Sequence, residues 1–538
     1  MQGPWCGASR RRAAFFYPAL RGFLRAWLRK FRPPSGTSPL AFSLAVCKKP
    51  LTNAHQSPLA MPRLSSKTLP GVKPGVVVPA YDRAKTTIGI VHFGPGAFHR
   101  GHQACYIDSL LPRDPRWAIC GAELLPTGLA AQAVPQDHLY VVAQLDEQIR
   151  YRVVGSHTEY LKAYGQADRI FARLNDPAVK FVTMTVTEKG YCLDGAGALD
   201  LDHPAIAEDL KHPTAPKTLV GWVTEGLARR KAAGMLPFTP ISCDNMVMNG
   251  HKLHGAVLRY AEARGDRDLT AWIRDNVRFP STMVDSITPA ATDELKDRIE
   301  REVGLRDEAP VQREAFLQWV VEDVLGPDAP DLASVGAMLT KDVAAYELAK
   351  LRLLNGAHST LAYAGELRGH TSVGEAMADA KLSRFVELMM REDIVPTLRK
   401  TPGLNFNAYI SDLLDRFRNP ALTHKLIQIC SDGSQKLPYR ILGSMADALA
   451  GGRRIDRFAF AMAAWMRFVA RETKASRELQ DPLNPALQAI GKASTGRAED
   501  DVPAFLALRE VFSAELADAP KVVEAITTAY GTFDHILD

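Results

Sequence analysis

Three polar residues, Lys350, Asn355 and His358, interrupt an otherwise apolar stretch of the chain. Apolar side chains recur at helical spacing through residues 341–365, which predicts one helix. At about 100° per residue the three polar positions lie at roughly 0°, 140° and 80°, so they share one half of that helix. A lysine beside an apolar face loses solvation, and this lowers its pKa.

A lysine with a lowered pKa can act as a general base. A shift from ~10.4 to ~7.5 costs about 4 kcal/mol and makes an amine usable near neutral pH. Lys350 would then take the hydroxyl proton of an alcohol as hydride leaves for a nicotinamide. Asn355 could donate to the developing alkoxide, and His358 could orient the lysine or the substrate. The pattern alone leaves a structural alternative open, in which Lys350 snorkels, Asn355 and Gly356 break the helix, and His358 is a core histidine.

A glycine turn with the sequence GPGAFHRGH follows an apolar strand at residues 87–93 and opens a helix. Glycines in this position let backbone N–H groups approach a pyrophosphate, although His99 replaces the third glycine of the usual G-x-G-x-x-G pattern. An acid after the second strand normally holds the ribose, and Glu123 is the candidate. We therefore expect NAD, with NADP left open. The other expected cofactor contacts are Phe93, Gly94, Pro95, Gly96, Ala97, Phe98, His99 and Arg100.

Three histidines near this turn, His92, His99 and His102, invite interpretation as a metal site. No carboxylate is spaced to complete such a site, and His92 lies within the strand. We expect these rings to pack or to contact phosphate, and we expect no metal.

The order of the predicted elements indicates two domains after an amino-terminal arm. Further strands at 117–120 and 181–186, with helices through 202–233, predict a doubly wound α/β domain over residues 81–275. Strands then fade, and residues 276–538 read as mainly α-helical. The helices expected there are 291–303, 311–325, 341–365, 375–392, 406–417, 439–450, 456–471 and 503–528.

Residues 1–80 form a basic leader and a flexible arm. They hold 13 lysines and arginines and no acid, which leaves 53 basic and 60 acidic residues in the rest of the chain. A basic amphipathic helix, as predicted near residues 19–31, is typical of a membrane-surface segment or an organelle presequence, unless translation begins at Met61. The acidic body argues against nucleic acid as a partner. No apolar run reaches the ~20 residues of a membrane span. Seven scattered cysteines favour a reducing compartment, so we expect the cytoplasm.

The ordered motifs of the chain resemble the polyol-specific long-chain dehydrogenases and reductases, the mannitol dehydrogenase family. The resemblance covers nearly everything from Pro79 to Tyr530. The segments that carry it are residues 92–102, 185–192, 242–250, 279–285, 350–358 and 431–436.

The resemblance implies an extended Rossmann-type domain followed by a mainly helical domain, and a catalytic lysine without metal. The family pattern K-x4-N-x2-H falls on Lys350, Asn355 and His358. A second catalytic asparagine falls on Asn245, and Asn249 is the weaker candidate.

Within the family, this chain is more similar to the fructuronate reductases, which act on a sugar acid. They share the sequence around Lys189, and a uronate carboxylate requires a cation such as Lys436 or Arg440. Asp285 completes the expected substrate contacts. Ser286, Gln428 and Tyr439 depart from the pattern. The alternatives are a mannitol 2-dehydrogenase or other polyol dehydrogenase and, from another class, a nucleotide-binding protein without catalysis. The expected partner is a small sugar acid or polyol.

Overall fold

A five-stranded parallel sheet forms the centre of the amino-terminal half of the protein. The computed structural model describes residues 61–422 and 424–536, so the helix expected near residues 19–31 lies outside the described residues. The strand order is β5-β2-β1-β6-β7, and all four neighbouring pairs are parallel. The strands are β1 Ile88–Phe93, β2 Ala118–Glu123, β5 His157–Lys162, β6 Phe181–Met184 and β7 Thr239–Ser242. This is the doubly wound α/β fold expected from the sequence.

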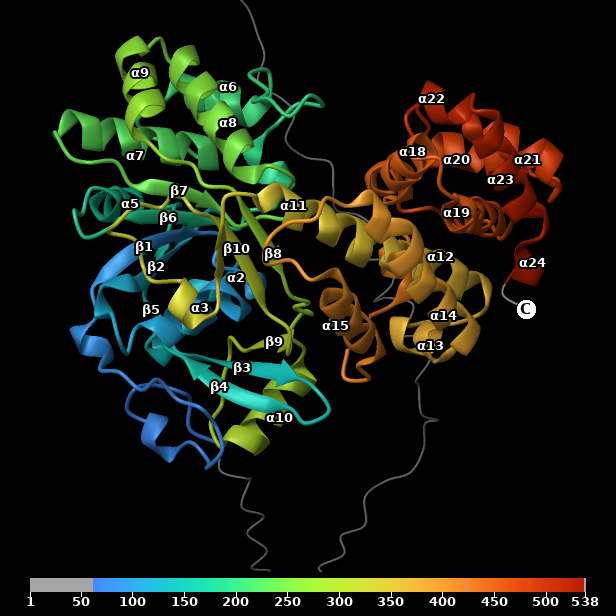
Figure 1. Ribbon diagram of the computed structural model, residues 1–538. Helices are drawn as coiled ribbons and strands as arrows, with labels where there is room; N and C mark the ends of the chain where they lie inside the picture. Colours follow the sequence, from blue (N-terminus) through green and yellow to red (C-terminus); the bar gives the residue numbers. More distant parts are fainter. Residues whose placement is uncertain (1–60, 423, 537–538) are drawn as a thin grey trace, which may run out of the picture. The chain divides into compact units, whose positions relative to one another are not determined.

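Both faces of this sheet are covered, as a parallel sheet requires. Side chains alternate between them, so that on β1 Val91 packs into one core cluster and Ile90 into another. Four helices that cover the first face appear above the sheet in Figure 1: α6 Pro204–Lys211, α7 Leu219–Ala232, α8 Asn249–Ala263 and α9 Arg267–Asn276. α5 Ala167–Leu174 packs into the same core. On the second face lie α3 Gln103–Leu110 and strands of two smaller sheets.

The two smaller sheets correct one prediction. They have the strand orders β4-β3-β9 and β11-β10-β8. Residues 311–325, which were expected to form a helix, contain the strands β9 and β10 instead. The prediction failed because a short apolar run such as Trp319–Val321 has no period that distinguishes a buried strand from a buried helix. The strands of the two smaller sheets are β3 Tyr140–Leu145, β4 Arg150–Val154, β8 Thr282–Asp285, β9 Val311–Glu314, β10 Gln318–Glu322 and β11 Met338–Thr340.

Residues 61–80 are not a flexible arm. Leu64 is fully buried, and its backbone N–H donates to the Arg306 carbonyl at 2.8 Å. Val77 exchanges backbone hydrogen bonds with Tyr151 and Val153 beside β4. The Pro- and Gly-rich composition disfavours regular elements without preventing such irregular pairing.

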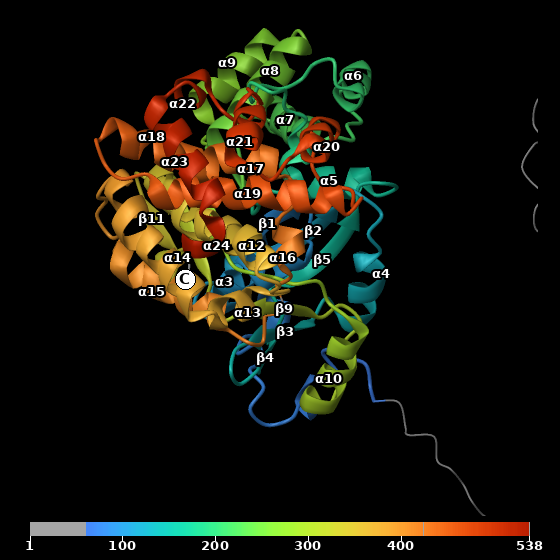
Figure 2. The same ribbon diagram turned by 90° about the vertical axis from the view of Figure 1, so that its right-hand side faces the viewer.

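The carboxyl-terminal half is helical and packs around α19. This helix is buried on nearly all sides and contacts α12, α20 and α23 (Figure 2). The expected helix at 375–392 is divided where Asp379 caps a new helix, and the one at 503–528 is divided into three. The helices are α11 Val343–Ala349, α12 Ala357–Leu367, α13 Val373–Ala378, α14 Ala380–Leu388, α15 Phe406–Arg418, α16 Leu426–Ile429, α17 Gly433–Leu437, α18 Gly443–Ala450, α19 Asp456–Lys474, α20 Asn484–Ala493, α21 Ala498–Leu506, α22 Ala514–Ala517, α23 Pro520–Gly531 and α24 Phe533–Ile536.

The described residues also contain three further α-helices, short 3₁₀ turns and three π-helical turns. The α-helices are α2 Ala97–Gly101, α4 Leu129–Ala133 and α10 Asp293–Val303, and the π-helical turns are η7 Lys350–Gly356, η8 Met389–Ile394 and η10 Pro438–Leu442. Across residues 61–536, apart from position 423, no helix has the length and apolar character needed to cross a membrane.

Candidate active site

The helix that carries Lys350 contains a π-helical turn. α11 begins at the Asp342 cap and contacts β8 and β10, and η7 then continues without interruption into α12. In a π-helix the hydrogen bonds run from residue i to i+5, so side chains five positions apart lie above one another. Lys350 and Asn355 are therefore brought closer together than the 140° of a regular α-helix would allow. The helix break considered from the sequence does not occur.

The Lys350 amine is buried and held by two acceptors. Its Nζ donates to Asn245 Oδ1 at 2.8 Å and to the Val284 carbonyl at 2.5 Å. Burial lowers the pKa of Lys350, and Arg416 and Arg440 add to this, while Asp285 and Glu347 oppose it. An ammonium has three donors. With two of them held, the third proton, or the lone pair that replaces it, is left for a substrate.

The two candidate asparagines have different surroundings. Asn245 follows β7 and is exposed apart from its bond to Lys350. Its neighbour Asp244 accepts hydrogen bonds from the Val186 and Thr187 backbone, which holds this loop beside the end of β6. Asn249 is fully buried and bonds to Thr282 in both directions. The structure thus brings Asn245 to the lysine and gives Asn249 a role in joining α8 to β8.

His358 lies two residues beyond Gly356, in the first turn of α12, and its ring is neutral. The ring stacks on Phe417 at 5.3 Å and meets His424 edge-on at 4.8 Å. Burial, followed by His424 and Arg440, holds the pKa of His358 well below its usual value. Its Nε2 is buried without a hydrogen-bond partner in the described residues. A neutral imidazole with one free nitrogen can donate to or accept from a substrate hydroxyl or carbonyl.

The three cations predicted to bind a substrate carboxylate, Arg440, Lys436 and Lys189, have different surroundings. A Cβ on Gly356 would lie 2.9 Å from the Arg440 carbonyl, so glycine lets η10 pass close to the catalytic helix. Arg440 NH1 donates to Ser359 Oγ at 3.1 Å, and the guanidinium has no acidic partner among residues 61–422 and 424–536. Lys436 donates to the Ser431 carbonyl at 2.6 Å. Lys189 is exposed on the turn Glu188–Tyr191.

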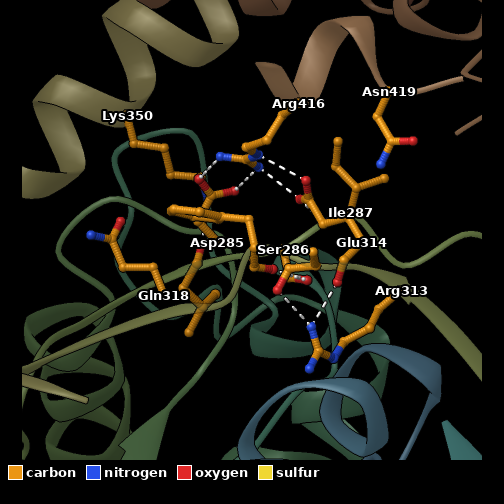
Figure 3. A network of polar contacts seen from close by, with 12 residues as sticks. Asp285, Ser286, Ile287, Arg313, Glu314, Gln318, Lys350, Arg416 and Asn419 are labelled. Carbon is orange, nitrogen blue, oxygen red and sulfur yellow. Dashed lines mark hydrogen bonds and ion pairs between the residues drawn. The ribbon is translucent and has the colours of Figure 1, made fainter. Parts of the chain in front are cut away.

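Asp285 belongs to a buried ion network (Figure 3). Arg416 donates to both Asp285 oxygens, at 2.8 and 3.1 Å, and to both Glu314 oxygens, at 2.8 Å. Burial raises the pKa of Asp285, but Arg416 and Lys350 lower it more, so the net shift is downward. Both carboxylate oxygens are occupied by Arg416, so the predicted substrate contact of Asp285 is not supported by its position.

The glycine turn presents backbone to solvent and side chains to the core. Gly94 has a φ of +79°, and a Cβ there would lie 2.2 Å from the Thr185 carbonyl oxygen. Gly94 is half-buried, and Gly96 is exposed before the first turn of α2. This is a cradle in which backbone groups can approach a pyrophosphate, and the residues present fit a dinucleotide.

Three predicted cofactor contacts point elsewhere. His99 is buried and shares a 3.2 Å hydrogen bond with His157. Arg100 reaches inward to the Ala309 carbonyl at 2.5 Å. Glu123 is 2% exposed, and one of its oxygens accepts from the Leu129 backbone at the start of α4. The sequence located the turn correctly, but local spacing could not reveal that these side chains face the interior. Phe93 and Pro95 are also buried, whereas Ala97 and Phe98 are partly exposed.

The three histidines of the turn pack against one another and the core. His92 stacks on His99 with ring centroids 3.3 Å apart, and His102 stacks on Phe98. Burial lowers the pKa of His92 and of His102 to about 3. In the described part of the chain, no group of three histidine, cysteine or acidic side chains is arranged to hold a metal ion.

Sequence reasoning missed Arg416, Glu314 and Glu347. Glu347, one turn before Lys350, accepts from the Met248 backbone, and burial raises its pKa to about 7. One signal for Arg416 was present, because it falls on the apolar stripe of its helix with Tyr409 and Leu413. A charged residue on such a stripe is buried only when it is paired.

Comparison with known proteins identifies two family domains in this chain. Residues 88–332 match the mannitol dehydrogenase Rossmann domain, and residues 342–534 match the mannitol dehydrogenase C-terminal domain. The D-mannonate oxidoreductase of Escherichia coli (strain K12) is 39% identical over 464 residues, which are 85% of this chain and 95% of that protein. The mannitol 2-dehydrogenase of Phaeosphaeria nodorum is 37% identical over 478 residues, which are 87% and 83% of the two chains.

A solved structure extends the likeness to three dimensions. The Pseudomonas fluorescens mannitol 2-dehydrogenase, in a ternary complex with NAD and D-mannitol, has a TM-score of 0.75 and 35% identity. The match covers 88% of this chain and 97% of that one. The two family domains and the relatives together show that this chain belongs to the mannitol dehydrogenase family of secondary-alcohol oxidoreductases.

Proposed function

We propose that this protein is an NAD-dependent oxidoreductase that interconverts D-fructuronate and D-mannonate, with Lys350 as general acid and base. The observation that carries the proposal is the buried Lys350 amine, held by Asn245 Oδ1 and the Val284 carbonyl with one proton position free. A positioned amine with a lowered pKa suits proton transfer near neutral pH.

The chain's own residues account for the proton and for the developing charge. In the oxidation direction neutral Lys350 accepts the proton of the substrate hydroxyl, and in the reduction direction its ammonium returns that proton. Asn355 and the free Nε2 of His358 can hydrogen-bond the reacting oxygen, which stabilises alkoxide character. When bound, NAD accepts hydride from the alcohol carbon, and NADH returns it to the ketone.

NAD is the proposed cofactor, and Gly94 and Gly96 would hold its pyrophosphate through their backbone. The solved relative contains NAD, which supports this choice. Glu123 is buried and its Oε1 accepts from the backbone at the start of α4, so its position does not favour a ribose contact, and NADP stays the alternative.

The unpaired guanidinium of Arg440 favours a sugar acid over a neutral polyol. Arg440 is half-buried, and burial lowers its pKa, although Tyr363, Glu188 and Asp432 oppose this. A partly desolvated cation without a direct ion pair is stabilised when a ligand supplies an anion. The Ser359 bond places Arg440 next to His358 in the same site. A uronate carboxylate at one end of the substrate would complete this pair.

Mannitol 2-dehydrogenase activity is the second candidate. The relatives with that name are nearly as similar to this chain as the D-mannonate oxidoreductase, and the lysine site would serve a neutral polyol equally well. The substrate end of the site, not the lysine, distinguishes the two.

Steady-state kinetics with fructuronate and fructose at equal concentrations test the assignment. We expect a clear preference for fructuronate, and a preference for fructose overturns it. Arg440→Met should lower kcat/KM for fructuronate and change that for fructose little. Arg454→Met, in an exposed pair with Asp456, is the matched control and should alter neither.

A further inference from the structure

The buried ion network links the helical domain to the strand beside the catalytic lysine. Arg416 lies in the last turn of α15, while Asp285 ends β8 and Glu314 ends β9. All three side chains are less than a tenth exposed. The guanidinium also covers the Phe316 ring at 4.1 Å. Such a pair has a fixed geometry, because a planar guanidinium matches a carboxylate at two points.

Lys350 and Arg416 approach the same short piece of β8 from different elements. Lys350 donates to the carbonyl of Val284, the residue immediately before Asp285. In Figure 3 the Asp285 carboxylate lies between the side chains of Lys350 and Arg416. Within the described residues, Lys350 forms no ion pair with Asp285, although each influences the charge of the other. The acceptors of the lysine are neutral groups.

We propose that Arg416 is a positioning residue of the reaction: by holding the Asp285 carboxylate at two points, it keeps Lys350 on its neutral acceptors and available to the substrate. If Arg416 were absent, Asp285, the acid that most favours the ammonium form of Lys350, would lose its partner. An ion pair between Asp285 and Lys350 would keep the lysine protonated and draw it from the reacting oxygen. This inference rests on the proposed role of Lys350 as the base, and it does not depend on which sugar is the substrate.

The charges that act on Lys350 come from several elements. Arg416 on α15 and Arg440 on η10 disfavour its protonated form, while Asp285 on β8 and Glu347 on α11 favour it. His102, between α2 and α3, also interacts with the amine but is neutral at ordinary pH. Loss of Arg416 removes a cation and frees two carboxylates, of which Asp285 acts on Lys350, so these changes act in the same direction.

The test is the pH profile of kcat/KM for oxidation of mannonate, or of mannitol if that is the substrate turned over. Oxidation needs neutral Lys350, so its rate rises with pH up to the pKa of the lysine. In Arg416→Gln this acid limb should move to higher pH. At a pH on the limb, the rate should fall about tenfold for each pH unit by which the limb moves. Ketone reduction needs the ammonium, so its alkaline limb should move to higher pH as well. A damaged fold would lower both rates at every pH without shifting either limb.

A second substitution identifies the route. In Arg416→Gln with Asp285→Asn, the cation and the anion are both removed, so the acid limb should return close to its original pH. Arg416→Lys should keep the limb near its original position. A limb that does not move in Arg416→Gln, or that stays shifted in the double variant, overturns the proposal.

Two controls keep the result interpretable. Asp285→Asn alone retains the Arg416–Glu314 pair and removes an anion that favours the ammonium form of Lys350, so the acid limb should move to lower pH. An acid limb that stays in place or moves to higher pH overturns the proposal, even if Arg416→Gln does not fold. Arg457→Gln removes an arginine from a comparable pair with buried Asp393 and should shift nothing. Lys350→Ala is measured first. If it retains turnover, the proposed function fails; if it is inactive and the limbs do not respond, only the role of Arg416 fails.

Discussion

The glycine turn and the Lys350 helix both contain many polar side chains, yet the turn offers its backbone to a ligand and the helix offers its side chains. At the glycine turn the side chains of His92, His99 and Arg100 are buried, while the backbone at Gly96 faces solvent. At the Lys350 helix the backbone is bonded within the helix, and the side chains of Lys350, Asn355 and His358 are left for chemistry. A polar residue beside a motif therefore indicates a site only when its side chain is not needed by the core.

Replacing Lys350 by Ala should have the largest effect and separate the two regions. Turnover should fall about 10²–10⁴-fold, the usual contribution of a general acid or base. NADH affinity, measured by fluorescence titration, should stay within about twofold, because Lys350 lies outside the glycine turn that would hold the cofactor. A twofold change corresponds to less than about 0.5 kcal/mol of binding free energy. Retained turnover would contradict the proposed chemistry, and lost NADH binding would contradict the separation.

Replacing Gly94 by Ala should reverse that pattern. The added Cβ meets the Thr185 carbonyl and the residue has a positive φ, so the turn must distort. We expect NADH affinity to fall at least about tenfold, equal to 1.4 kcal/mol, together with a lower Tm. Gly255→Ala is the control, because a Cβ at Gly255 of α8 meets nothing within 4 Å. Unchanged NADH affinity in Gly94→Ala would show that the cradle lies elsewhere.

The buried histidines of the glycine turn predict a loss of stability in acid. The pKa of His92 is about 3 in the fold, and that of an unfolded histidine is ~6.5. Its neutral form is therefore favoured by folding, and stability falls as pH drops below about 6.5 and the unfolded chain takes up the proton. Between pH 7 and 5 His92 should account for about 2 kcal/mol of the lost free energy of unfolding. Urea titrations of the protein and of His92→Asn should differ by that amount in their pH dependence. Equal pH dependence would mean that the ring is solvated.

Replacing Lys189 by Met should have the smallest effect. Lys189 is exposed, and a solvated charge contributes about 0–1 kcal/mol, equivalent to a change of about fivefold or less in kcat/KM. A larger loss that is specific for the sugar acid would show that Lys189 joins Arg440 at the substrate. The comparison would then extend to a third region, the turn after β6.

The elements that sequence predicted well are those with a local signal. The apolar strand before Gly94, the α/β alternation and the Lys350 helix each follow from a period or a turn residue within a few positions. The α/β fold followed from them, whereas the family followed from the resemblance of several ordered motifs. The site residues expected from the K-x4-N-x2-H pattern do lie on one helix.

The features that sequence did not predict depend on contacts between distant residues. Arg416 bonds a carboxylate 131 positions earlier in the chain, and nothing near either residue specifies that partner. His99 contacts His157 on β5, 58 positions later in the chain, and Glu123 bonds to the backbone of α4. β9 and β10 were mistaken for helix because their apolar runs are too short to have a clear period.

The π-helical turn also determines which changes in the gene the active site can tolerate. A π-turn holds one residue more than an α-turn, and this extra residue sets the rotation between Lys350 and everything after Asn355. Deleting a single codon between them would let the segment relax to an α-helix and turn the following chain by about 100°. His358 would then leave the lysine although no catalytic residue had been replaced. Over evolution the length of this segment should vary less than the identity of its apolar residues.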